Sequence, residues 1–170
     1  MKKIVLTYGG ISGLIVSLFL LSSVGYCYAT GNFQGNMWVG YASMILAFSL
    51  IFVGIKNFRD KQNEGIISFG KALKIGLFIT LIASSFYVIT WLIDYYFFIP
   101  DFMEKFENQA IQSLKSSGAS TSEISEKTAE MAGYKEMYKN PLWVIVLTYM
   151  EIVPVGLLVS LISALILKKK

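Results

Sequence analysis

The chain has 170 residues, of which 55% are hydrophobic and 15% charged, and its formal net charge is +4. It contains no histidine and a single cysteine, Cys27, which excludes an internal disulfide and the histidine-based zinc sites of many enzymes. Between Ile4 and Ile55 there is no Asp, Glu, Lys or Arg. An uncharged segment of that length is typical of a chain that crosses a lipid bilayer.

Four apolar stretches have the roughly 20 residues that a helix needs to cross a bilayer. They cover residues 4–28, 37–55, 75–98 and 142–167. Backbone polar groups in hydrocarbon must form hydrogen bonds within their own segment, so we expect four helices in spite of the many β-branched and aromatic residues. The first stretch is longer than the apolar region of a signal peptide, about 7–15 residues. We therefore expect it to be retained as a span.

The distribution of charge predicts how these spans are oriented. Lysine and arginine dominate the N-terminus, the segment 56–74 and the C-terminus, whereas most acidic residues lie between 101 and 136. Because basic residues favour the cytoplasmic side, we expect both termini in the cytoplasm and 56–74 to be a basic cytoplasmic loop. Within it, Ser68 can cap a helix that begins near Phe69 and continues into the third span. Attraction to anionic lipid explains the basic loop without nucleic acid as a partner.

The segment 101–140 is the only sizeable part outside the predicted spans. Apolar residues at helical spacing predict two amphipathic helices, about 101–115 and 121–138, and Ser120 with Glu123 matches a capping box at the start of the second. We expect the two helices to form an extracytoplasmic hairpin over the outer ends of the spans. Its apolar stripes fit packing against the bilayer surface or each other, or alternatively a face that binds a partner.

Small residues recur at every fourth position on the first and fourth spans. Such stripes allow two helix backbones to approach closely in a membrane. We expect the two spans to pack antiparallel along these faces, the alternative being that one stripe mediates a homodimer. The candidate packing residues are Gly9, Gly13, Ser17, Gly156, Ser160 and Ala164.

Two acidic residues lie inside predicted spans, Asp94 and Glu151. A carboxylate in hydrocarbon costs several kcal/mol, so each should be protonated, paired or exposed to water. Glu151 follows Leu142 by nine residues, about 13 Å along a helix, which places it near the middle of the membrane. Pro154 has no N–H and leaves the Met150 carbonyl without its helical donor. We regard Glu151, Asp94, Pro154 and Met150 together as the candidate intramembrane polar site.

The candidate site has two interpretations. Glu151 and the free carbonyl could bind a proton, a cation or a water molecule on a pathway, or they could form a structural kink in which Glu151 bonds to hydroxyl groups of another span. No arrangement of nucleophile and base is present in the sequence, and we expect no catalytic residue, metal site or cofactor.

Several segments resemble one bacterial family. They are Gly54–Lys61, Gly65–Ala72, Pro100–Phe102, Glu151–Gly156 and Leu161–Ala164. Together they are similar to the membrane family called domain of unknown function 4199 over nearly the full length. The resemblance implies a bacterial inner-membrane protein with about four spans, and it implies no activity or binding residues.

The sequence therefore predicts an all-α integral membrane protein with four transmembrane helices and an extracytoplasmic helical hairpin between spans three and four. The function we expect is non-enzymatic, that of a small scaffold or accessory subunit with a membrane-protein partner or a second copy of itself. The alternative is a small transporter or channel-like component that moves protons or cations through Glu151.

Overall fold

The computed structural model describes residues 1–33 and 37–169 and is all-helical apart from one isolated backbone bridge. Its elements, in chain order, are α1 (Lys2–Thr30), α2 (Met37–Gln62), α3 (Phe69–Ile93), the π-helix η1 (Asp94–Phe98), α4 (Phe102–Ser116), α5 (Thr121–Tyr138) and α6 (Pro141–Leu167). Four helices are long and apolar enough to cross a membrane: α1, α2, α3 with η1, and α6. The fold is thus a four-helix membrane bundle with a helical hairpin, α4–α5.

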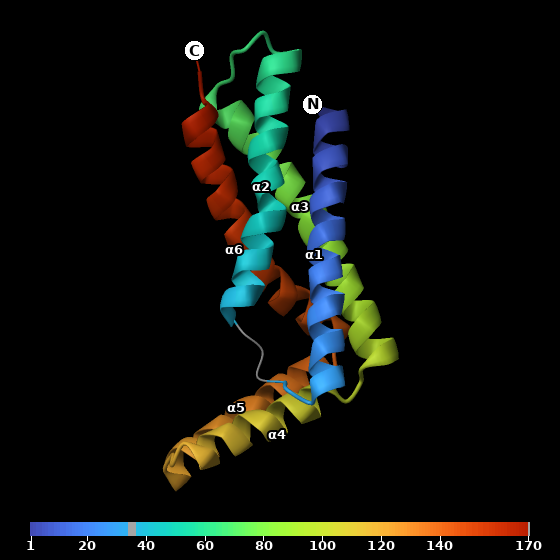
Figure 1. The fold of residues 1–170 in the computed structure, drawn as a ribbon, viewed down its shortest axis with the longest axis vertical. Coiled ribbons are helices and arrows are strands. Elements are labelled where there is room, and N and C mark those ends of the chain that lie inside the picture. Colours follow the sequence, from blue (N-terminus) through green and yellow to red (C-terminus); the bar gives the residue numbers. More distant parts are fainter. Residues whose placement is uncertain (34–36, 170) are drawn as a thin grey trace.

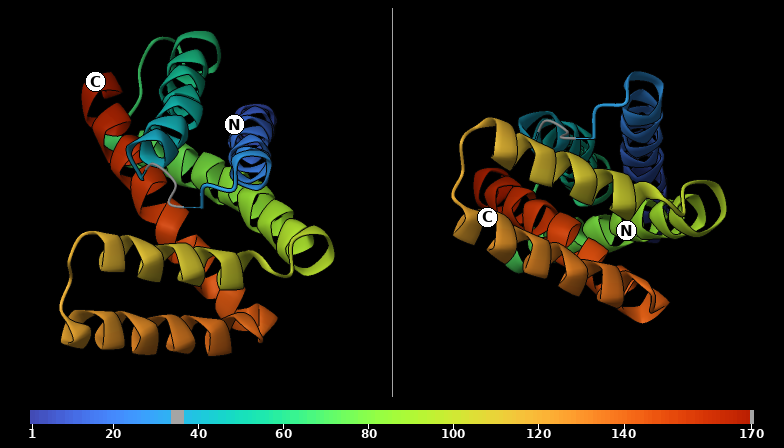
Figure 2. Two further views of the ribbon diagram at one scale, coloured as in Figure 1. Left: turned by 60° about the horizontal axis from the view of Figure 1, so that its bottom comes forward. Right: turned by 90° about the horizontal axis from the view of Figure 1, so that it is seen from below.

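The hairpin lies across one end of the bundle, and both termini lie at the other end (Figure 1). Seen from the hairpin end, α4 and α5 run side by side in opposite directions (Figure 2). The Ser120 hydroxyl accepts from the Glu123 backbone N–H while the Glu123 carboxylate accepts from the Ser120 N–H, which confirms the predicted capping box. An ion pair between Lys135 and Glu107 joins the two helices.

The basic segment 56–74 is mostly helical, and the predicted loop is shorter at its α2 end. Helix α2 continues to Gln62, and α3 begins at Phe69 after Ser68, whose hydroxyl accepts from the Lys71 backbone N–H. Only residues 63–68 connect the two helices. Good helix formers with charged side chains extend a span beyond the apolar region without breaking it.

A backbone pairing holds this connection to the C-terminal end of α6. Ile67 and Lys169 exchange two N–H···O=C bonds of 2.9 Å, and the Arg59 guanidinium donates to the Leu167 carbonyl at 3.3 Å. The end of the bundle that carries the termini is therefore closed by hydrogen bonds as well as by packing.

Helix α3 lies at the centre of the bundle and packs against both α1 and α6, whereas α1 and α6 hardly touch. A Cβ added to Gly9 would lie 2.9 Å from Ile82, and one added to Gly13 would lie 2.7 Å from Phe86. The stripe on α1 therefore packs on α3 and not on the fourth span.

The stripe on α6 packs on the other side of α3. A Cβ at Gly156 would collide with Thr80, and Ser160 contacts the position of Gly76. The prediction that the first and fourth spans pack against each other is thus wrong, and both stripes are buried within one chain, away from any homodimer face. The reason is that α3 carries small residues of its own. These are Gly76, Thr80 and Ser84, all buried.

The half of the bundle nearer the termini has a dense apolar core. Phe48, Ile51, Ile55, Ile75 and Ile79 have no exposed surface. Large apolar side chains on the outward faces of the same helices are exposed, as expected where lipid replaces water. The half nearer the hairpin is packed differently, since a cavity lies there.

Candidate ligand cavity

A cavity of about 760 Å³ lies between the hairpin and the four spanning helices. All four spanning helices and both hairpin helices contribute to its wall. Its volume falls in the range of small-molecule pockets, about 300–1,000 Å³. It is the larger of two pockets found among the described residues, the other being a site of about 380 Å³ at residues 62–66.

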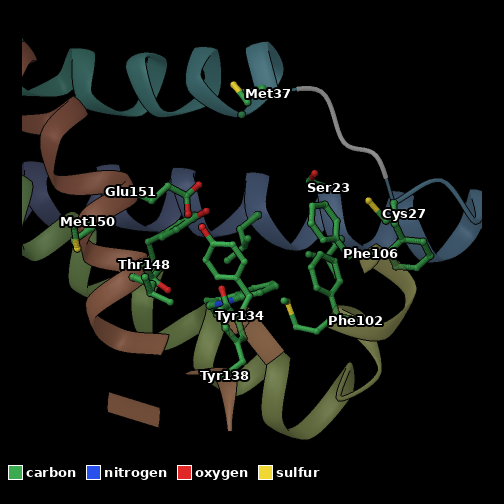
Figure 3. A pocket seen from close by; sticks show the side chains of 18 of the residues that line it. Ser23, Cys27, Met37, Phe102, Phe106, Tyr134, Tyr138, Thr148, Met150 and Glu151 are labelled. Carbon is green, nitrogen blue, oxygen red and sulfur yellow. The ribbon is translucent and has the colours of Figure 1, made fainter. Parts of the chain in front are cut away.

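Glu151 supplies the only carboxylate from a spanning helix to this cavity. It lies ten residues after Pro141, about 15 Å from the start of α6 at 1.5 Å per residue. Its side chain is exposed and points into the cavity from α6 (Figure 3). Within the described residues Glu151 forms no ion pair and no side-chain hydrogen bond.

The hairpin forms the opposite wall from aromatic side chains. Phe102 and Phe106 of α4 and Tyr134 and Tyr138 of α5 converge on the space that Glu151 faces (Figure 3). Phe102 also packs edge-on against Trp91 of α3, with ring centroids 5.2 Å apart. The wall is therefore held in place by contacts between the hairpin and the bundle.

Tyr138 is the residue of this wall whose hydroxyl group is influenced by Glu151. Burial raises the pKa of the Tyr138 hydroxyl, interaction with the Trp91 side chain opposes that shift, and the nearby Glu151 adds to it. Glu151 also interacts electrostatically with Tyr87 of α3. Phenol groups of α3 and α5 thus line the cavity together with the carboxyl group, and none of them forms an ion pair with it.

The rim of the cavity toward the hairpin is polar. Lys127 and Glu130 of α5 line it and form an ion pair of 2.8 Å. Their charges cancel, because one is the direct partner of the other. The rim is thus open to polar groups but contributes no net charge.

Two exposed methionines line the cavity on α2 and α6. Met37 of α2 and Met150 of α6 both line it, and they are 74% and 69% exposed. Methionine side chains are flexible and polarisable and adapt to ligands of different shape. Part of the cavity wall is therefore accessible from outside the bundle at these two side chains.

The structure separates the four residues of the predicted polar site. Glu151 and Met150 line the cavity, whereas Pro154 lies on the exposed face of α6 within an unbroken helix and does not. Asp94 does not line the cavity either. It is the first residue of η1, and its side chain is buried with Oδ2 lacking a hydrogen-bond partner among the described residues.

Sequence reasoning missed most of the residues that make the cavity. Tyr41, Tyr87, Trp91 and Met44 come from helices α2 and α3, far in sequence from Glu151. The one available signal was the number of methionines and tyrosines in so short a chain, 7 and 10. No local spacing indicated that they share one space.

The cavity can be described by the chemical groups that line it. No group of three or more His, Cys, Asp or Glu side chains in the described residues is placed to hold a metal ion. Cys27 lines the cavity, but it is buried and no basic residue among the cavity-lining side chains lies beside it to activate a thiolate. What the cavity offers is one carboxyl group, several hydroxyl groups and a large aromatic and thioether surface.

The chain belongs to the family described as protein of unknown function DUF4199, whose model matches residues 7–169. This confirms the family resemblance of the sequence. Comparison with curated proteins and with solved structures finds no match.

Proposed function

We propose that this protein binds a small amphiphilic molecule in the cavity between its hairpin and its bundle. The observation that carries the proposal is the cavity itself. It has a volume of about 760 Å³, its wall is mostly apolar and aromatic, and the carboxyl group of Glu151 lies at the end of the cavity away from the hairpin, which we call its deep end. Concave apolar sites with a few converging polar groups are where proteins bind small molecules. The role is non-enzymatic, because no nucleophile and base converge there.

The same proposal includes the location. The protein lies in the inner membrane of a bacterium with both termini in the cytoplasm and the hairpin outside. The basic residues at the end with the termini support this orientation. Access to the cavity is then from the outer leaflet, past Met37 and Met150, or from the outer surface past α5.

Binding is favoured over the transport of protons or cations through Glu151. Phe48 is fully buried and lies against Gly156, five residues beyond Glu151 along α6. Ile51 and Ile152 are fully buried as well. These side chains close the cytoplasmic half, so transport needs a large opening of the core that binding does not need.

A scaffold or accessory role is not opposed to ligand binding. A ligand between the hairpin and the bundle would fix the orientation of the hairpin, and a membrane-protein partner could bind that orientation specifically. The ligand is the part of the proposal that the geometry supports directly, and it is the part to test first.

The test uses the full chain in nanodiscs and the neutral fluorescent probe N-phenyl-1-naphthylamine. Gly40 lines the cavity on α2, and a Cβ there meets no neighbour within 4 Å, so Gly40→Phe should fold and fill the space. Gly25 on α1 is equally unhindered but does not line the cavity, so Gly25→Phe is the matched control. We expect probe binding above empty nanodiscs for the wild type and Gly25→Phe, and loss of it for Gly40→Phe.

Equal probe binding by Gly40→Phe and wild type would overturn the proposal. The transport alternative has its own readout. Cation flux into proteoliposomes that Glu151→Gln abolishes would favour a pathway over a binding site.

A further inference from the structure

The net charge of the cavity wall restricts what it can bind. Three formally charged side chains line the cavity: Lys127, Glu130 and Glu151. The first two form an ion pair with each other. Glu151 is left with no cation among the described residues, and an ionised Glu151 gives the cavity a net charge of −1. An anionic ligand would meet repulsion there that nothing in the wall compensates.

The depth of Glu151 argues against a phospholipid. A lipid entering from the outer leaflet keeps its charged headgroup near the surface and extends its acyl chains toward the middle of the membrane. Glu151 lies about 15 Å along α6 from the hairpin end, where acyl chains would be. A carboxyl group at that depth is costly beside hydrocarbon and favourable beside a positive charge.

The side chains around Glu151 suit an organic cation. Tyr87 and Trp91 of α3 and Tyr138 of α5 line the same cavity as Glu151, and both tyrosines interact electrostatically with Glu151. The faces of Tyr and Trp rings attract positive charge when the ring centroid lies within about 6 Å. A carboxyl group framed by aromatic rings is the arrangement that binds ammonium-type cations.

A small inorganic cation fits less well. Hard cations need six or more oxygen ligands at short distance, whereas Glu151 is the only carboxyl group at the deep end of a cavity of about 760 Å³. Most of the remaining wall is aromatic or aliphatic, with methionine thioethers, which bind apolar surface.

From these contacts we infer that the ligand of this cavity is a compact organic monocation with apolar substituents, its positive centre against Glu151 and its substituents on the aromatic and methionine side chains. The inference rests on the proposed function and names its ligand class.

The experiment compares two probes of nearly the same size and shape and of opposite charge, tetraphenylphosphonium and tetraphenylborate. Equilibrium dialysis measures each against the protein in nanodiscs of neutral lipid, with empty nanodiscs subtracted. We expect saturable binding of tetraphenylphosphonium and at least about tenfold weaker binding of tetraphenylborate, as a single close charge pair provides at the surface of a protein. Glu151→Gln should weaken the binding of tetraphenylphosphonium by about tenfold or more and reduce the difference in affinity between the two probes.

Variants and the neutral probe separate the possible failures. Gly40→Phe should abolish tetraphenylphosphonium binding, and Gly25→Phe should leave it unchanged. Cavity-dependent binding of both charged probes with equal affinity, or binding of tetraphenylphosphonium that Glu151→Gln does not change, would overturn the inference that the ligand is a cation. The proposed function would still stand. No cavity-dependent binding of N-phenyl-1-naphthylamine or of either ion would overturn both. Circular dichroism and elution volume of Glu151→Gln show whether that variant is folded, and Glu151→Asp, which keeps the charge, should retain the preference for the cation.

Discussion

Gly156 of α6 lies directly against the side chain of Thr80 of α3, so closely that a Cβ on the glycine would occupy the space of the threonine. One turn further along α6, the Ser160 hydroxyl lies 3.2 Å from the Thr80 hydroxyl and also donates to the Gly156 carbonyl at 2.7 Å. Two helices that cross with small residues can gain close packing and a hydrogen bond where lipid offers neither. This crossing fixes the position of α6, and with it the position of Glu151.

The first prediction concerns this crossing. Gly156→Val should lower the free energy of unfolding by about 1–3 kcal/mol, because overpacking a closely packed interface forces the helices apart. Thermal unfolding in detergent measures it. Gly25→Val is the matched control, since a side chain there meets no neighbour. Unchanged stability of Gly156→Val would show that α3 and α6 do not cross at this point.

The second prediction concerns Asp94. Its Oδ2 atom is buried without a partner among the described residues, and a buried polar group without a hydrogen bond costs about 1–3 kcal/mol. Asp94→Asn keeps the size of the side chain and removes the possibility of an unpaired charge, so the variant should be as stable as the wild type or more stable by about 1 kcal/mol. Thermal unfolding of the two proteins at neutral pH compares them. A clear loss of stability would show that the carboxylate has a partner.

The third prediction concerns the joint between α1 and the hairpin. Asp101 accepts from the Tyr28 hydroxyl at 2.5 Å and pairs with Lys105 at 2.7 Å. The interaction with Lys105, followed by that with Tyr28, lowers the pKa of Asp101 below its ordinary value. A carboxyl group with a lowered pKa in the folded state contributes stability above its unfolded pKa, about 3.9, and that contribution is lost as the pH falls through the folded value.

Below about pH 4 the hairpin should therefore become less firmly attached to α1. Hydrogen exchange at the start of α4, measured between pH 6 and pH 3 and corrected for the intrinsic exchange rate, should show lower protection at the acid end. In Asp101→Asn, protection should be low throughout and should change less with pH. The same pH dependence in both proteins would assign the effect to other carboxyl groups.

The fourth prediction concerns orientation. Ser117 is exposed at the tip of the hairpin, and Lys61 is exposed in the last turn of α2 at the opposite end of the bundle. In a Cys27→Ser background, Ser117→Cys should react with a membrane-impermeant maleimide in intact bacterial spheroplasts, and Lys61→Cys should react only after the membrane is permeabilised. The reverse pattern would place the termini outside.

Much of the fold follows from short stretches of sequence. The spans, the two hairpin helices and the caps at Ser68 and Ser120 are properties of contiguous residues, since hydrophobic length and capping act over a few turns. The helix that begins at Phe69 after Ser68 was predicted in the same way. The loop was wrong only for residues 56–62, because charges mark the end of the membrane and α2 continues past that point to Gln62.

The candidate site shows the limit of this reasoning more sharply. Glu151 stands out in the sequence because a carboxyl group within an apolar span is rare and costly. Whether it meets hydroxyl groups, another acid or open space depends on which helices surround it. In the structure, Glu151 pairs with no cation among the described residues. Asp94 lies outside the cavity, whereas Tyr87 and Tyr138 line it together with Glu151.

By itself the sequence determined that the chain has four apolar helices, a helical hairpin after the third, and one acid deep in the fourth. The tertiary structure alone decided that α3 lies between α1 and α6 and that the hairpin covers a cavity into which Glu151 points. The physical reason is that hydrophobicity and capping are local, whereas close packing is not. Gly156 and Thr80 are more than sixty residues apart in sequence, as are Glu151 and Tyr87. Only the shapes of the assembled helices determine that the first pair meets and that the second pair lines one cavity.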